Sequence, residues 1–158
     1  MRAIALAALL AVAPAAALPS PKIVATDLDT GVVVLCRPAL EDLTLAYTHS
    51  MYGGEVREVF VGGDDGRLRR LEMTTANAAA AEYYAYDGRV LLDADGFRVV
   101  VAPLTLDTLP VVLDRVGQHR LRFTDTEVAL TEAGDEPVQA TLDVGSTPFV
   151  ARALTSTC

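Results

Sequence analysis

Positive charge is scarce in this sequence. Lys22 is the only lysine among 13 basic residues, which stand against 21 acidic residues and leave a formal net charge of −8. A surface of this sign repels phosphate backbones and anionic lipid headgroups. We therefore expect no nucleic-acid binding, and no membrane-surface binding beyond the N-terminal segment.

Long apolar stretches are missing after the first 17 residues. Residues 1–17 have a basic start, an apolar run over 3–13 and small residues up to Ala17, which is the pattern of a secretory signal. The run is shorter than the roughly 20 residues that cross a bilayer. We expect cleavage after Ala17 and a periplasmic or secreted mature chain, residues 18–158, that forms a single β domain. The alternative is a membrane anchor formed by an uncleaved signal.

Cysteine is equally scarce, since Cys36 and Cys158 are the only two. An exported chain meets an oxidising compartment, and an even number of cysteines permits one bridge. A Cys36–Cys158 disulfide would tie an early strand to the last residue. The alternative is two unpaired thiols.

Alternating apolar and polar residues dominate the rest of the chain, with Asp- and Gly-rich turns between the runs. The expected strands are 23–26, 32–36, 43–51, 56–60, 68–73, 97–101, 121–123, 128–130, 138–142 and 149–154. Short strands divided by turns are typical of all-β proteins. We predict an antiparallel sandwich or a partly open barrel.

Two segments interrupt this pattern. Residues 75–84 are rich in alanine, which favours helix, but a segment of this length is unstable without tertiary support. We predict a short helical or irregular segment there, either a loop or a single turn. Residues 104–116 contain Pro110 and are expected to form a crossover connection.

The stretch YTHSMYGGEVREVF, residues 47–60, places two ionisable residues on its apolar face. If Gly53 and Gly54 form a two-residue hairpin turn, counting outward places His49 directly opposite Glu58. Each of these buried polar groups then offsets the desolvation cost of the other. We predict a cross-strand pair that either fixes the register of the hairpin or holds a small ligand.

Catalytic and metal-binding patterns are missing around this pair. Ser50 adjoins His49, but neighbouring residues of a strand point to opposite faces, and no G-x-S-x-G elbow occurs. The only other histidine, His119, has no cysteine or carboxylate at a recognised ligand spacing, and we assign it to a solvated strand edge. We expect no metal and no cofactor. A hydrolase with His49 as base and Glu58 as its orienting partner is kept as an alternative.

Two blocks of the sequence carry a resemblance to a known family. The stretches LTLAYTHSMYGGEVREVF and RVGQHRLRFTDTEVALTEA resemble small exported bacterial domains of unknown function. Members of that family are typically encoded beside the fused permeases of TRAP-type transporters of the TAXI class. The resemblance covers roughly residues 32–145 and implies a non-catalytic accessory domain. Such a domain would bind a transporter component, the permease or its solute-binding protein, or a small solute.

One departure from the family falls at Asn77. Where the family carries a Gly-Ala-Gly segment, this chain has Asn77 followed by alanines. If the glycines let the backbone approach a ligand closely, this part of the site is altered here. The candidate ligand- or partner-binding residues are therefore His49, Ser50, Glu58 and Asn77. A purely structural domain is the remaining alternative.

Overall fold

The computed structural model describes residues 19–38, 42–86, 88–100, 102–130 and 138–148. The strands are β1 (Pro19–Asp27), β2 (Val33–Pro38), β3 (Leu43–Thr48), β4 (Glu55–Gly62), β5 (Leu68–Thr75), β6 (Arg89–Asp93), β7 (Gly96–Val100), β8 (Leu104–Leu106), β9 (Thr108–Leu113), β10 (Arg120–Arg122), β11 (Glu127–Ala129) and β12 (Val138–Pro148). A short helix, α2 (Ala78–Ala85), follows β5.

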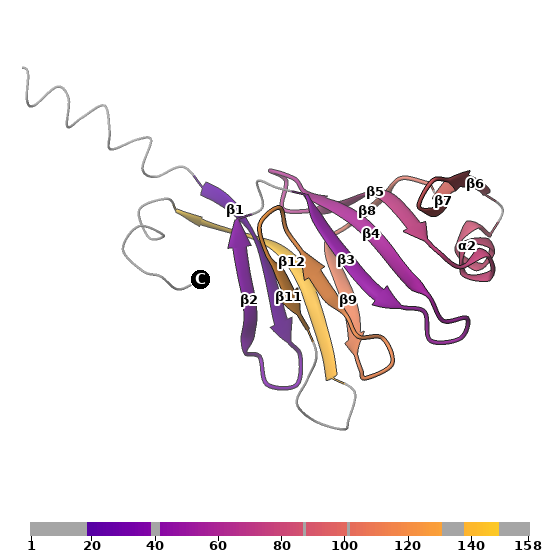
Figure 1. Cartoon of the computed structure of the whole chain (residues 1–158). Helices are drawn as coiled ribbons and strands as arrows, with labels where there is room; N and C mark the ends of the chain where they lie inside the picture. Colours follow the sequence, from indigo (N-terminus) through magenta and orange to yellow (C-terminus); the bar gives the residue numbers. More distant parts are fainter. Residues whose placement is uncertain (1–18, 39–41, 87, 101, 131–137, 149–158) are drawn as a thin grey trace, which may run out of the picture.

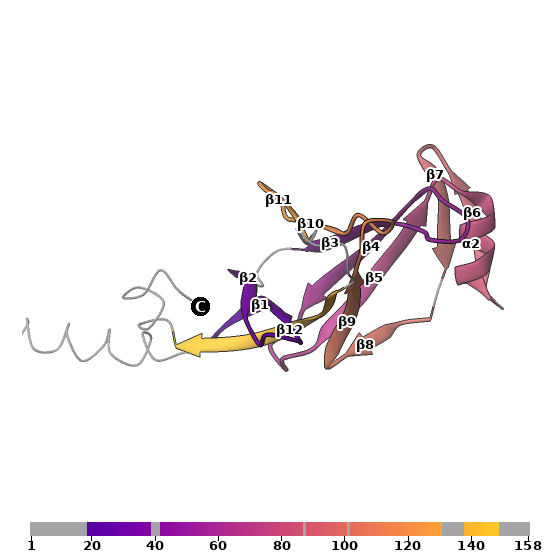
Figure 2. The same cartoon turned by 90° about the horizontal axis from the view of Figure 1, so that it is seen from below.

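The strands form two antiparallel sheets (Figure 1 and Figure 2). The smaller sheet has the order β2-β1-β12-β9. The larger has the order β11-β10-β3-β4-β5-β7-β6, and β8 pairs with the other end of β5. Both sheets are open, so the predicted all-β fold is confirmed, and of the two predicted architectures the structure has the sandwich.

The main core lies between the two sheets. Its buried side chains come from both, and they are Ile23, Ala25, Leu35, Leu43, Leu45, Phe60, Leu68, Val111, Leu113, Leu121, Leu130, Ala140 and Leu142. A second, smaller cluster contains Val56, Met73, Ala81 and Val99, and it joins the far end of the larger sheet to α2. In both views, α2 lies beside β6 and β7, away from β1 and β2 (Figure 1 and Figure 2). The helix thus covers a part of the larger sheet that the smaller sheet does not reach.

The segment 104–116 does cross between the sheets, but it does so as two strands that the sequence analysis missed. β8 pairs with β5 of the larger sheet, and β9 pairs with β12 of the smaller one. Pro110 lies in β9, which is an edge strand. A residue without an N–H is tolerated at a sheet edge because no ladder bond is lost on the open side.

The alanine-rich segment forms a helix of eight residues, which confirms the predicted short helical segment but is longer than a single turn. Tertiary contacts supply the support that its length requires, since Ala80 and Ala81 are fully buried. Asn77 caps its N-terminus, where Oδ1 accepts the N–H of Ala79 at 2.9 Å and of Ala80 at 3.2 Å. The Asn77 amide also donates to the carbonyl of Tyr52 at 2.8 Å, which ties the helix to the β3–β4 turn.

Three predicted features lie outside the described residues, namely the signal segment, the strand at 149–154 and Cys158. Cys36, in β2, is disulfide-bonded. The Cys36–Cys158 pairing stays a prediction.

We predict that Asn77→Ala lowers the free energy of unfolding by about 1–2 kcal/mol, the usual cost of losing an N-cap. Urea denaturation followed by circular dichroism measures this. The control is Asn77→Asp, which keeps the cap acceptor and loses only the amide that bonds Tyr52. Its cost is smaller because a negative charge at a helix N-terminus is favourable. Equal losses in the two variants would contradict the capping role.

Candidate functional site

The hairpin of β3 and β4 has a different register from the predicted one. Leu45, not His49, lies directly opposite Glu58. The last ladder pair is Thr48 with Glu55, so the turn is longer than Gly53 and Gly54 alone. The predicted cross-strand pairing of His49 with Glu58 is therefore wrong.

The side chain of His49 stabilises the longer turn. Its Nδ1 accepts the backbone N–H groups of Met51 and Tyr52, both at 3.2 Å. Asn and Asp side chains stabilise turns through equivalent bonds. The His49 N–H donates to the Gly54 carbonyl at 3.0 Å, and the Gly53 N–H donates to the His49 carbonyl at 2.9 Å. The turn thus spans residues 50–53.

The inward orientation of the two residues was predicted correctly. His49 is 7 % exposed and Glu58 is 9 % exposed. Pairing Glu58 with Leu45 instead of His49 moves the register by an even number of residues, which leaves each side chain on its predicted face. The wrong register therefore gave Glu58 the wrong cross-strand partner but left His49 and Glu58 on the buried face.

Glu58 is held by Tyr47 and Arg70. Arg70 Nη1 donates to Oε2 at 2.9 Å, and the Tyr47 hydroxyl donates to Oε1 at 2.9 Å. The same hydroxyl lies 2.9 Å from the hydroxyl of Tyr84. Because a hydroxyl has one proton and a carboxylate only accepts, Tyr47 accepts its second bond from Tyr84. The charge of Glu58 is thus balanced within the fold.

The two tyrosines stay protonated. Burial raises the pKa of Tyr47 far above its usual value, and the charge of Glu58 and the bond to Tyr84 raise it further. Burial also raises the pKa of Tyr84, against a smaller lowering by its bond with Tyr47. Both hydroxyls therefore act as neutral hydrogen-bonding groups.

The sequence predicted a solvated strand edge for His119. The structure shows instead a half-buried ring that packs on Tyr47. Its ring stacks on that of Tyr47, with centroids 5.4 Å apart and planes 20° apart. Burial lowers its pKa below the usual value, although the charge of Asp114 opposes this. Its Nδ1 is buried and has no hydrogen-bond partner among the described residues. His119 is therefore a neutral ring with an unsatisfied polar atom.

These side chains surround a pocket of about 300 Å³. It is lined by Leu45, Tyr47, Thr48, His49, Ser50, Glu58, Tyr84, Leu109, Pro110, Val111, Val112, Asp114 and His119. Three of the four candidate residues, His49, Ser50 and Glu58, thus share one pocket, while Asn77 is outside it. Tyr47, Tyr84, Asp114 and His119 were not predicted as site residues. Tyr84, Asp114 and His119 come from segments far from the hairpin in sequence, and Tyr47 was assigned to the apolar face of β3.

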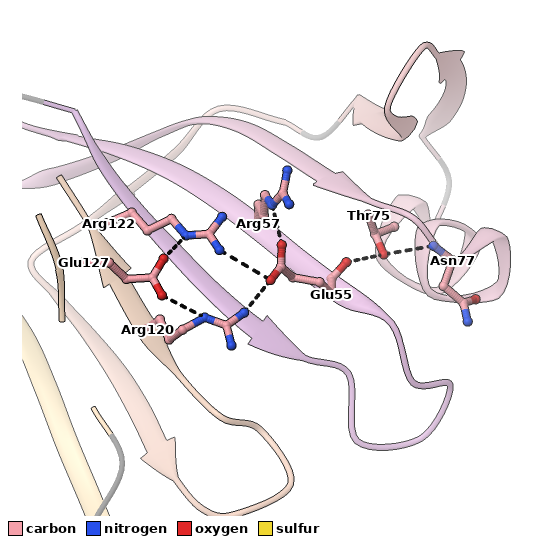
Figure 3. Close-up of polar contacts among 7 residues, drawn as sticks. All are labelled: Glu55, Arg57, Thr75, Asn77, Arg120, Arg122 and Glu127. Atoms are coloured by element: carbon pink, nitrogen blue, oxygen red, sulfur yellow. Dashed lines mark hydrogen bonds and ion pairs between the residues drawn. The ribbon is translucent and has the colours of Figure 1, made fainter. Parts of the chain in front are cut away.

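The opposite face of the larger sheet carries a separate ion-pair network (Figure 3). Glu55 bonds Arg57 at 2.5 Å and Arg120, and it lies 3.7 Å from Arg122. Both Arg120 and Arg122 also pair with Glu127. Burial alone raises the pKa of Glu55, but the bond to Arg57 and the three arginine charges outweigh it and lower the pKa. The network links side chains of β4, β10 and β11 on the outer face, where such partly exposed ion pairs contribute little to stability.

Comparisons with protein-family models, with curated proteins and with solved structures give no match to this chain. Within the described part of the chain, the one helix is too short to cross a membrane. The same residues contain no group of three or more His, Cys, Asp or Glu side chains arranged to hold a metal ion. The family resemblance therefore stays a prediction.

We predict that His119 makes the fold sensitive to mild acid. Its folded pKa lies below the usual 6.5, so the unfolded chain takes up the proton first as the pH falls. Its contribution to stability is complete above about pH 6.5 and is lost as the pH falls towards the folded pKa. Urea denaturation at about pH 7.5 and pH 5.5 should show a smaller loss for His119→Asn than for the wild type.

The Glu55 network does not interfere in this window. The pKa of Glu55 is lowered from 4.5, so its contribution to stability is lost only as the pH falls below about 4.5, outside the tested range of pH 5.5 to 7.5. His49→Asn serves as the second control, because Asn keeps an acceptor at the Nδ1 position. Equal losses in the wild type and in His119→Asn would contradict the assignment of a buried, neutral His119.

Proposed function

We propose that this protein is a non-catalytic exported accessory domain that binds a small solute in the pocket around His49 and Glu58. The observation that carries the proposal is the pocket itself, which unites three of the four candidate residues. Its volume of about 300 Å³ is at the lower end for ligand pockets. Its lining combines apolar side chains with a few polar groups, as ligand sites usually do.

Hydrolysis by His49 and Glu58 is the less favoured alternative. A base–orienter pair requires the carboxylate to accept a ring N–H of the histidine. Here His49 Nδ1 accepts two backbone N–H groups, and both oxygens of Glu58 are bonded to other side chains. These bonds suit fixed recognition groups better than groups that transfer protons.

A purely structural role is also less favoured. Protein interiors are normally packed to the density of organic crystals, and an unfilled volume is destabilising. A fold with no ligand gains nothing from leaving a volume of about 300 Å³ unfilled. A bound solute would fill this volume.

A second pocket, of about 290 Å³, is the weaker candidate. It lies on the outer face of the larger sheet and includes Glu55 and Arg57. Both side chains are already committed to the ion-pair network. Several other lining residues, such as Glu72 and Asp93, are exposed. This face offers fewer fixed groups for recognition than the pocket around His49.

We further propose that solute binding serves a TRAP-type transport system of the TAXI class. The support is the resemblance over residues 32–145. The partner would be the permease or its solute-binding protein. A pull-down with tagged mature protein should enrich one of these two, and enrichment of neither would contradict the transporter link.

The binding proposal predicts that Ser50→Trp abolishes stabilisation by solutes. Ser50 is exposed at the rim of the pocket, so an indole there obstructs the entrance without disturbing the core. Thermal unfolding of the wild type is first screened against a panel of small polar metabolites. A compound at 100 times its Kd stabilises the fold by about 2.7 kcal/mol.

The matched control is Met51→Trp, which places the same indole one residue further along. Met51 is 72 % exposed and lies outside the pocket lining. It should respond to the selected compound as the wild type does. The proposal fails if Ser50→Trp responds equally, or if no compound in the panel stabilises the wild type.

A further inference from the structure

The pocket lining has negative charge and no fixed positive charge. Its two carboxylates are Glu58 and Asp114, and no lysine or arginine is among the described residues that line it. Arg70 balances Glu58 from outside the lining. His119 contributes no charge, because burial keeps its pKa low. With Glu58 offset by Arg70, an anionic ligand would still meet the negative charge of Asp114, with no lysine or arginine among the described lining residues.

The lining is also rich in aromatic rings. Tyr47 stacks on His119, and the rings of His49 and Tyr84 meet edge to face with centroids 5.4 Å apart. Aromatic faces carry partial negative charge and attract cations, more strongly where water is excluded. Because the Tyr47 hydroxyl donates to a carboxylate, its ring is enriched in electron density. The rings and the carboxylates therefore favour the same sign of ligand charge.

Strand β9 forms the apolar wall of the pocket with its unpaired edge. Four consecutive residues, Leu109 to Val112, line the pocket. Neighbouring side chains of a strand point to opposite faces, so consecutive lining residues mean that the strand borders the pocket along its edge. Among the strands that the structure describes, β9 pairs only with β12, so its other edge has no strand partner there.

Pro110 makes this edge poor in hydrogen-bond donors. The Gln139 carbonyl faces β1, where it accepts the N–H of Leu28 at 2.8 Å. The next residue of β12, Ala140, therefore turns its polar groups to Val111 of β9. Pro110 then turns its own carbonyl to the open edge and has no N–H to add there, so along this stretch the edge N–H comes from Val112. Such an edge suits a ligand that donates hydrogen bonds.

We propose that the pocket selects a small organic cation, with an ammonium group against the rings and carboxylates and a short hydrocarbon portion against β9. This inference rests on the proposed function and names the class of its solute. An ammonium group supplies donors to the remaining lone pairs of the carboxylates and to the Pro110 carbonyl. The neutral His49 Nε2–H is then available to a hydroxyl or carbonyl oxygen elsewhere on the same ligand.

The test compares three probes of similar size that differ in charge. The wild-type chain, labelled with ¹⁵N, is titrated with n-butylammonium chloride, n-butanol and sodium butanoate at constant ionic strength. Amide shifts of the lining residues report binding. We expect butylammonium to bind about tenfold more tightly than butanol, and butanoate to bind most weakly.

Asp114→Asn tests the contribution of charge to this preference. Asp114 Oδ1 accepts the Gly117 N–H at 2.5 Å, and Asn retains that acceptor while removing the charge. Butylammonium affinity should fall about five- to tenfold, with butanol affinity unchanged. The control is Asp64→Asn, an exposed turn residue outside the lining, which changes the net charge equally and should have no such effect.

The outcomes separate this inference from the proposed function. Equal affinities for butylammonium and butanol, or tightest binding of butanoate, would overturn the cation preference and leave solute binding in place. Equal losses in the Asp114 and Asp64 variants would also overturn it. If no probe binds while a metabolite stabilises the wild type but not Ser50→Trp, only the ligand class is wrong. If neither experiment detects binding, both proposals fail.

Discussion

The larger sheet is wider than the smaller sheet that covers it, and this mismatch determines the remaining architecture. An apolar sheet face must be buried against another layer. The smaller sheet buries one part of the face, and α2 buries another through Val56, Met73 and Ala81. Tyr47 packs against both clusters, so it marks the boundary between the two covers. The pocket opens at this boundary.

Hydrogen-bonded polar side chains, rather than apolar packing, occupy the boundary between the two apolar clusters. Glu58 lies on the inner face of β4, between the two apolar clusters, and needs partners because an unpaired buried charge is costly. Arg70 and Tyr47 supply them, and Tyr84 extends the chain of bonds to α2. These side chains fix each other's positions, so the site has rigid polar walls before any ligand binds. Preorganised groups of this kind reduce the entropy cost of binding.

The sequence predicted strands and faces better than it predicted partners. Period-two alternation placed His49 and Glu58 on the inner face, because that inference needs only local order. Gly53 ends the turn and Gly54 follows it opposite His49, and both have positive φ, 65° at Gly53 and 78° at Gly54. The predicted register was wrong because it assumed that Gly53 and Gly54 alone form the turn. The hydrogen bonds from Met51 and Tyr52 to the His49 ring add turn residues that alternation does not reveal.

The other errors arise from contacts between distant segments. The alanine-rich helix extends beyond one turn because Ala80 and Ala81 are buried, which the sequence does not show. His119 is half-buried and stacks on Tyr47, a contact between β3 and a segment some 70 residues later. Strand β9 was missed because Pro110 argues against a central strand and does not exclude an edge strand.

The arrangement of the pocket depends most on the orientation of His49, whose ring bonds the turn and lines the pocket. If Nδ1 accepts bonds from Met51 and Tyr52, the neutral ring carries its proton on Nε2. Long-range ¹H–¹⁵N correlation spectra of the histidine rings at about pH 7.5 distinguish the two tautomers directly. We predict the Nε2–H tautomer for His49. A proton on Nδ1 would contradict the observed turn and, with it, the arrangement of the pocket.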